Sequence, residues 1–233
     1  MKDKKRSTGA VHTIVFGSDQ GLVGQFNESL AEFVIASLSS TNFSARENVL
    51  WAIGERVEAR LRDFGLNPRA TFPVPNSVSA ITHLVGQVLA TCEVPRTTDG
   101  DYPVYLFHNR PESGALYVPN CSRILPLDRT WLNAISEIRW PTHSLPEVLN
   151  EGDATLHALI REYLFVSMFK ACAESLAAEN ANRLSAMQRA KKNIDDLLGG
   201  LEQAYHHQRQ SSIDEELFDL VSGFEALKAK NPQ

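Results

Sequence analysis

The sequence has few cysteines, no long apolar run and no excess of positive charge. Its three cysteines lie far apart in no metal-ligand spacing, which argues against a disulfide framework or zinc site and is typical of a reducing compartment. No stretch approaches the ~20 apolar residues of a membrane-spanning helix. A formal net charge of -5 gives no electrostatic reason to expect nucleic-acid binding. Any association with a membrane is therefore expected to come through a partner.

The sequence also lacks a known nucleotide-binding motif. Residues 11–27, VHTIVFGSDQGLVGQFN, have the order of strand, glycine-containing loop and helix start in which many proteins hold a phosphate. A dinucleotide fingerprint needs Gly-x-Gly-x-x-Gly, whereas three residues separate Gly17 from Gly21. A P-loop needs Gly-Lys-Ser/Thr, whereas Gln-Phe follows Gly24. We therefore predict no cofactor, no metal, no catalytic residue and no specific binding of ATP or NAD.

Short apolar runs alternate with amphipathic stretches over residues 11–127. The expected strands are VHTIVF, VLWAI, RATFPV, YPVYLF and GALYVPNCSRILPL, and the expected helices cover residues 28–39, 55–64 and 78–92. This order predicts an α/β domain whose mostly parallel sheet is covered by helices. The last two runs, separated by HNRPESG, are expected to form an antiparallel hairpin at one edge of the sheet.

The rest of the chain has a different composition. Residues 1–10 form a short basic segment that is expected to be disordered. Residues 128–152 contain two tryptophans and are expected to form an ordered connection. Residues 153–230 contain no proline and are rich in good helix formers, which predicts one helix ~110 Å long. Gly199-Gly200 interrupts it and is interpreted as a bend or a close crossing point.

An apolar stripe runs along this predicted helix. Its members advance mostly by alternating steps of three and four, as in a coiled-coil seam, and they are Leu184, Met187, Ile194, Leu198, Leu201, Tyr205, Ile213, Leu217, Leu220, Phe224 and Leu227. Such a stripe requires a second helix, so the segment is expected to be half of an antiparallel coiled coil.

Two segments carry a specific resemblance. Residues 174–227 read ESLAAENANRLSAMQRAKKNIDDLLGGLEQAYHHQRQSSIDEELFDLVSGFEAL, and they resemble, element by element, a helix with ES-ASE, AM-A, N-DL, RQ-x-x-I, EL and VSG in that order. The stretch GSDQGLVGQFN similarly resembles an SDRGLCGG-N loop. Both belong to the gamma subunit of rotary F-type ATP synthases. The variant loop is more similar to the alternative, sodium-linked bacterial ATPases than to the common enzyme.

The resemblance implies two partner-contact sites. In the family a Rossmann-like domain binds no nucleotide and packs against a two-helix shaft, and its loop faces the catalytic subunits. The matching loop residues are Ser18, Asp19, Gly21, Leu22, Gly24 and Asn27. Asp19 or Ser18 is expected to cap the following turn. On the long helix, Arg209, Gln210 and Glu216 match the second family site, which implies polar contacts between shaft and catalytic loops.

The resemblance also implies a function. A member of this family is the central-stalk, rotor subunit that couples ion flow through a membrane ring to ATP synthesis or hydrolysis, without catalytic residues of its own. The implied partners are the alpha and beta subunits of the catalytic head, the epsilon subunit and the membrane ring. The implied location is peripheral, at the cytoplasmic face of the bacterial inner membrane. The sequence leaves the coupling ion, proton or sodium, open.

One departure from the family lies at the start of the chain. The family begins with a long N-terminal helix that pairs antiparallel with the C-terminal one, and this sequence begins just before its first strand. We expect a truncated product, a misassigned start or a second helix that comes from elsewhere.

Two other classes of protein are alternatives to the rotor subunit. A Rossmann-like nucleotide-binding enzyme would use Glu55 as a ribose ligand and the long helix as a coiled-coil dimerisation arm. The glycine spacing is wrong for it, and Glu55 lies further from the loop than the ~20 residues expected. A coiled-coil adaptor would account for the helix but would leave the α/β domain unexplained.

Overall fold

The computed structural model describes residues 10–39, 48–92, 103–113, 115–127, 129–139, 141–144, 147–148 and 152–230. Its elements are β1 (Val11–Phe16), α1 (Phe26–Ser39), β2 (Asn48–Ile53), α2 (Glu55–Asp63), β3 (Ala70–Phe72), α3 (Val78–Thr91), β4 (Val104–Glu112), β5 (Ala115–Leu125), α4 (Arg129–Glu137) and α5 (Gly152–Lys230). The chain divides into two compact units, one ending at Leu184 and the other starting at Ser185. The domain boundaries expected from the sequence stay predictions, and residues 1–9 lie outside the described part of the chain.

The five strands form one mixed sheet in the order β3-β2-β1-β4-β5. The pairs β1–β2, β2–β3 and β1–β4 are parallel, whereas β4 and β5 are antiparallel. The predicted mostly parallel sheet and its edge hairpin are therefore confirmed. The order 3-2-1-4-5 is also that of the first five strands of a Rossmann fold.

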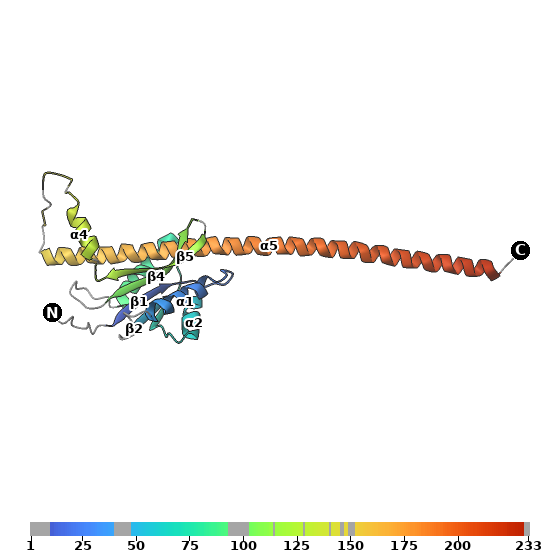
Figure 1. Ribbon diagram of the computed structural model, residues 1–233, viewed down its shortest axis with the longest axis horizontal. Coiled ribbons are helices and arrows are strands. Elements are labelled where there is room, and N and C mark those ends of the chain that lie inside the picture. The colour runs from blue at the N-terminus through green and yellow to red at the C-terminus, as the bar shows by residue number, and fades with distance from the viewer. Residues whose placement is uncertain are drawn as a thin grey trace. The chain divides into compact units, whose positions relative to one another are not determined.

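Alternation along the strands gives the sheet two buried faces. On β1, Ile14 and Phe16 pack in a cluster with α3 and the beginning of α5. Val11 and Val15 point the other way and pack with α1 and α2. Helices therefore cover both faces, and α5 is seen opposite α1 and α2 in Figure 1. A strand buried on both faces is expected to be mostly apolar, which agrees with the run VHTIVF, where only His12 and Thr13 are polar.

The first part of α5 belongs to this α/β unit. Its buried apolar residues follow a helical spacing, and they are Ile160, Leu164, Met168, Ala171, Cys172 and Ala178. Most of them pack on the same sheet face as α3. The long helix therefore supplies part of the core of the domain.

Two details differ from the sequence-based expectation. HNRPESG was expected to be a loop, yet β4 continues to Glu112. The register shifts between Arg110 and Glu112, and Pro111 lies at that irregularity because it has no N–H group for the ladder. In addition, α4 occupies part of the expected connection, where no helix was predicted.

The second unit consists of the rest of α5. The helix continues without a break through Gly199 and Gly200, where an added Cβ would meet nothing within 4 Å. The prediction of a very long helix is thus confirmed. Its large apolar side chains are exposed within this chain, including Met187, Ile194, Leu198, Leu201, Tyr205, Ile213, Leu217, Leu220 and Phe224. In the described part of the chain, no helix combines the length and apolarity that crossing a membrane requires.

Candidate functional site

The loop between β1 and α1 is held from inside by Ser18 and Asn27. The backbone N–H of Ser18 donates to Asn27 Oδ1 at 3.0 Å, and Asn27 Nδ2 donates to Ser18 Oγ at 2.8 Å. Ser18 Oγ also donates to the carbonyl of Gln20 at 3.1 Å. Both side chains are buried. In this chain, these two motif residues therefore fix the shape of the loop.

Asp19 joins the loop to two other segments. Its Oδ1 accepts the N–H of Glu55 at 2.9 Å, and its Oδ2 accepts the N–H of Val74 at 2.7 Å. Glu55 is the first residue of α2, whose N-cap Gly54 makes no side-chain cap bond. The carboxylate thus caps α2, where a negative charge also meets the positive end of the helix dipole. Of the two residues expected to cap the turn that follows them, Ser18 bonds within that turn, to the carbonyl of Gln20, whereas Asp19 binds α2 and Val74.

Two glycines are required by the shape of the loop. A Cβ on Gly17 would lie 2.3 Å from the Cβ of Val57, so only glycine fits between β1 and α2. Gly24 has a φ of +57°, a conformation that side chains disfavour. Gly21 differs, because a Cβ there would meet only Arg56 Nη2 at 3.9 Å, an ordinary contact.

Helix α5 holds the same loop from the other side. Ser175 Oγ donates to the carbonyl of Phe16 at 3.0 Å, and Asn182 Nδ2 donates to the carbonyl of Val23. Ala178 lies between them and packs against Val23 and the first residue of α1. Spacings of three and four place these α5 residues on one face of the helix. Ser175 and Asn182 were not predicted as site residues from the sequence, although both are polar residues on a mostly apolar buried face.

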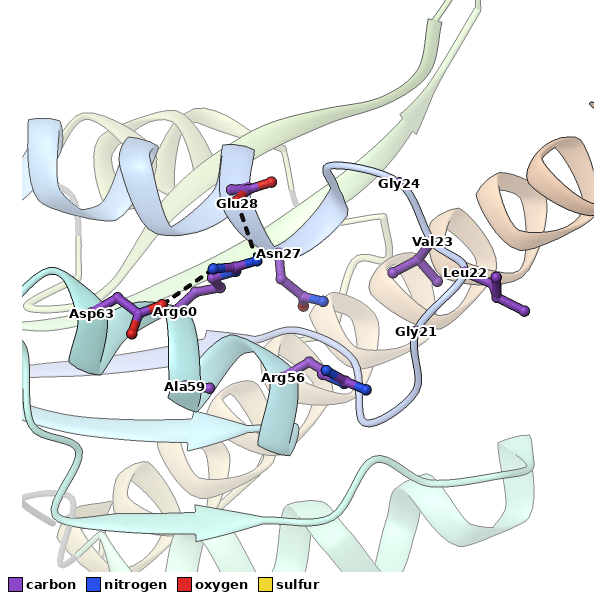
Figure 2. Close-up of a pocket in the computed structure, with 10 residues that line it drawn as sticks. All are labelled: Gly21, Leu22, Val23, Gly24, Asn27, Glu28, Arg56, Ala59, Arg60 and Asp63. Atoms are coloured by element: carbon purple, nitrogen blue, oxygen red, sulfur yellow. Dashed lines mark hydrogen bonds and ion pairs between the residues drawn. The ribbon is translucent and has the colours of Figure 1, made fainter.

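A pocket of about 340 Å³ opens between this loop and α2 (Figure 2). It is lined by residues 21–24 of the loop, by Asn27 and Glu28 of α1, and on α2 by Arg56, Ala59, Arg60 and Asp63. Arg60 lies 3.4 Å from Glu28 and 3.2 Å from Asp63, so two carboxylates balance its charge. Leu22 stands at the outer rim with a φ of +62° and 71% of its surface exposed. The pocket is thus polar, with one large apolar side chain at its edge.

Two largely buried ionisable pairs involve α5, and one of them joins it to β4. His108 Nε2 lies 2.7 Å from Glu174 Oε2, and burial lowers the pKa of the His108 imidazole more than this carboxylate raises it. Glu179 pairs with Arg183 one turn later, and burial raises the pKa of the Glu179 carboxyl despite the guanidinium beside it. The His108–Glu174 pair attaches α5 to β4, whereas the Glu179–Arg183 pair lies within α5, and neither pair lines the pocket.

Arg209, Gln210 and Glu216 lie on the part of α5 that belongs to the second unit. All three side chains are exposed and make no hydrogen bond or ion pair within the described residues. Arg209 and Glu216 are seven residues apart, or about two helical turns, and so they share one face. They offer a guanidinium fork and a carboxylate to whatever approaches that face.

The described residues contain no group of three or more His, Cys, Asp or Glu side chains that could hold a metal ion. Glu55, considered as a ribose ligand, is exposed at the start of α2, and its N–H is bound by Asp19. After β1, where a dinucleotide-binding fold holds its ligand, Ser18 and Asn27 hydrogen-bond to each other. What this region offers is a firmly held protein surface.

Comparison with known proteins agrees with this geometry. The family model described as ATP synthase matches residues 1–227. The ATP synthase gamma chain of Paracoccus denitrificans is 27% identical over 216 residues, covering 92% of this chain and 72% of that protein. The gamma chain of Glaesserella parasuis is 28% identical over 229 residues, covering 96% and 76%.

Solved structures show the same fold. A chain of the central stalk and c-ring of Tetrahymena thermophila mitochondrial ATP synthase is 25% identical, with a TM-score of 0.56 over 81% of this chain and 80% of that one. A chain of the Euglena gracilis mitochondrial ATP synthase has a TM-score of 0.62 over 96% of this chain and 74% of that one, at 15% identity. The chain therefore belongs to the ATP synthase family, and the relatives that it matches are gamma chains.

Proposed function

We propose that this chain is the central-stalk subunit of a rotary ATP synthase and couples ion flow through a membrane ring to ATP synthesis or hydrolysis. The match of the family model to residues 1–227 carries the proposal. The likeness to a chain from a central stalk and c-ring supports the position in the complex. The subunit itself is non-catalytic in this proposal, as its likeness to ATP synthase gamma chains suggests.

The proposed partners are the alpha and beta subunits of the catalytic head, the epsilon subunit and the membrane ring. The complex would hold the chain peripherally, at the cytoplasmic face of the bacterial inner membrane. Two regions would meet partners. One is the loop that contains Ser18, Asp19, Gly21, Leu22, Gly24 and Asn27, with Leu22 exposed at its tip. The other is the exposed face of α5 with Arg209, Gln210 and Glu216.

The test replaces two of these helix residues in the assembled complex. With the alpha, beta, epsilon and ring subunits present, Arg209→Ala and Glu216→Ala should each lower ATPase turnover or ion pumping by about ten- to a hundredfold. A charge-assisted hydrogen bond contributes roughly 1.5 to 3 kcal/mol, and the effect reaches the rate if the bond forms in one rotor state only. Steady-state ATPase assays and ion-pumping assays in vesicles give the two readouts.

Lys191→Ala is the matched control, because Lys191 is also an exposed charged residue of α5 in the second unit. It should change turnover by less than about fivefold, as a solvated surface charge contributes little. Thermal unfolding of the three variants should match that of the original chain, since none of these side chains has a partner within the described residues. Unchanged turnover and pumping in Arg209→Ala and Glu216→Ala would contradict the proposed partner contact on α5.

A further inference from the structure

The exposed apolar stripe of the second unit runs along α5 from Met187 to Phe224. Its large side chains are about half exposed or more, and the most exposed of them, Leu220, has 75% of its surface in solvent. At 1.5 Å per residue the stripe is ~55 Å long, or about five heptads. An apolar surface of this length is rarely left to water, so a second helix is expected to cover it.

Four charged residues lie in or beside this stripe. Two basic residues, Lys191 and Arg209, take stripe positions themselves, because each follows an apolar member by four residues. Two acidic residues flank the stripe, since Glu202 comes directly after one of its members and Glu216 comes directly before another. All four side chains are exposed and make no hydrogen bond or ion pair within the described residues.

The four charges alternate along the helix in a way that makes the stripe complementary to itself. In chain order they are basic, acidic, basic and acidic. In a second copy that runs antiparallel, the order is reversed, so Lys191 meets Glu216 of the second copy and Glu202 meets its Arg209. Both contacts occur twice, because the two copies are equivalent. A copy that runs parallel would instead place each charge beside its own like charge, which is unfavourable.

The same antiparallel alignment also matches the apolar side chains. Met187 and Ile194 lie 17 and 10 residues before Ala204, and Leu220 and Ile213 lie 16 and 9 residues after it. Each of the first two therefore faces one of the last two across the pair, as Lys191 faces its acidic partner. An interface between two identical chains related by a two-fold axis requires such a surface, because the same patch must complement itself.

We propose that the stripe binds a second copy of this chain, in an antiparallel coiled coil centred near Ala204. The apolar side chains form the seam, and Lys191, a polar residue at a seam position, fixes the orientation and the register. The dimer covers Arg209 and Glu216, which the proposed function assigns to contacts with other subunits. It is therefore a form of the unassembled chain, and it competes with assembly into the complex.

Sedimentation equilibrium of the full chain alone measures the dissociation constant of the dimer. Lys191→Glu and Glu216→Lys should each raise this constant about tenfold or more, because both copies of the altered contact become repulsive. An equimolar mixture of the two variants should dimerise about as tightly as the original chain, since each reversed charge then meets an opposite charge on the other copy. A mixture that stays as weak as the separate variants overturns the proposal.

Lys192→Glu and Glu215→Lys are the matched controls. They make the same changes of charge, but each residue lies two positions before a stripe member, or about 200° around the helix. Their dissociation constants should stay within about twofold of that of the original chain. Equal effects of Lys191→Glu and Lys192→Glu overturn the proposal. So do variants that dimerise as tightly alone as the original chain does, because a parallel pair gives that pattern.

A zero-length carbodiimide crosslinker tests the alignment in the original chain. Lys191 and Glu216 are 25 residues apart, or about 37 Å along one helix, so an amide bond between their side chains must join two chains. Mass spectrometry of mixed isotope-labelled and unlabelled chains should find this adduct. A chain that is monomeric at every concentration, or a dimer without the adduct, overturns the proposal. These measurements use the chain alone, so their failure leaves the proposed function to its own assays.

Discussion

The motif residues of the β1–α1 loop have two different physical roles. Ser18, Asp19 and Asn27 bind atoms of this same chain: the Ser18–Asn27 hydrogen bonds are buried, and those of Asp19 are partly buried to Val74 and exposed to Glu55. Leu22 alone among the matched loop residues offers a large side chain to solvent. The motif was predicted to be one partner-contact site. In the structure, Leu22 forms its exposed part, and Ser18, Asp19 and Asn27 form an internal framework that holds the loop in place. The framework residues are expected to affect stability first and partner binding second.

Asp19 gives the clearest test at this scale. Asp19→Ala leaves the N–H groups of Glu55 and Val74 without their acceptor. We expect the free energy of unfolding to fall by about 2 to 3 kcal/mol, since hydrogen bonds to a charged group contribute roughly 1.5 to 3 kcal/mol each and Asp19 is only partly buried. Urea unfolding measures the change.

Asp63→Ala is the comparison for this measurement. Asp63 is also a carboxylate near the pocket, but its partner is a half-exposed arginine, so its loss should cost less than about 1 kcal/mol. Asp19→Asn should lie between the two, because an amide oxygen can accept one of the two bonds. Equal stability of Asp19→Ala and Asp63→Ala would contradict the bridging role.

Secondary structure could be predicted where it depends on the apolar pattern and the propensities of neighbouring residues. The apolar strands and the long proline-free helix are found near the expected residues, because alternation and helix propensity act over a few positions. The end of β4 was not predictable, because the strand passes Pro111 by a register shift that depends on its partner β5. Contacts between residues far apart in the sequence were equally unpredictable. Asn182 lies 159 positions from Val23, and no local sequence pattern predicts their hydrogen bond.

The contact between β4 and α5 has a pH dependence of its own. His108 sits on β4 and meets Glu174 on α5, with Arg110 and Lys170 as the other charges that face it. Burial lowers the pKa of His108 in the folded chain, whereas the unfolded chain takes up this proton near the ordinary value of 6.5. The unfolded state thus binds more protons as the pH falls through that value, and the stability contributed by neutral His108 is lost.

We therefore predict that His108→Gln loses less stability on acidification than the original chain does. Between pH 7.5 and 5.5 the difference should be roughly 1 kcal/mol, which is the linkage expected of a single lowered histidine. Urea unfolding at several pH values measures it. His12, whose pKa burial also lowers, is present in both proteins and cancels from the comparison. Parallel pH curves for the two proteins would contradict the prediction.

The two units of the molecule differ in whether their large apolar side chains are buried or exposed. The first unit buries them in clusters on both faces of its sheet. The second unit is a single stretch of helix whose large apolar side chains are exposed in this chain. An isolated helix has little stability of its own in water, and a large exposed apolar stripe favours association.

The chain made alone is therefore predicted either to fray over the second unit or to self-associate through Leu198, Leu201, Leu217 and Leu220. Sedimentation velocity and hydrogen exchange measure the two outcomes. Replacing these four leucines by glutamine should abolish any self-association and leave the α/β unit folded, because the four lie outside it. A monomer with full exchange protection from Met187 to Phe224 would contradict the prediction.

The edges of the sheet limit how the α/β unit can recruit a partner. At one edge, β3 has only three residues, too few to guide the pairing of an incoming strand. At the other edge, β5 contains Pro119, which has no N–H group to donate to a neighbour. Strand addition, a common way for an extended peptide to bind a sheet, is thus disfavoured at both edges. Recognition by this unit falls instead to its loops and helix surfaces, where side chains make the contacts.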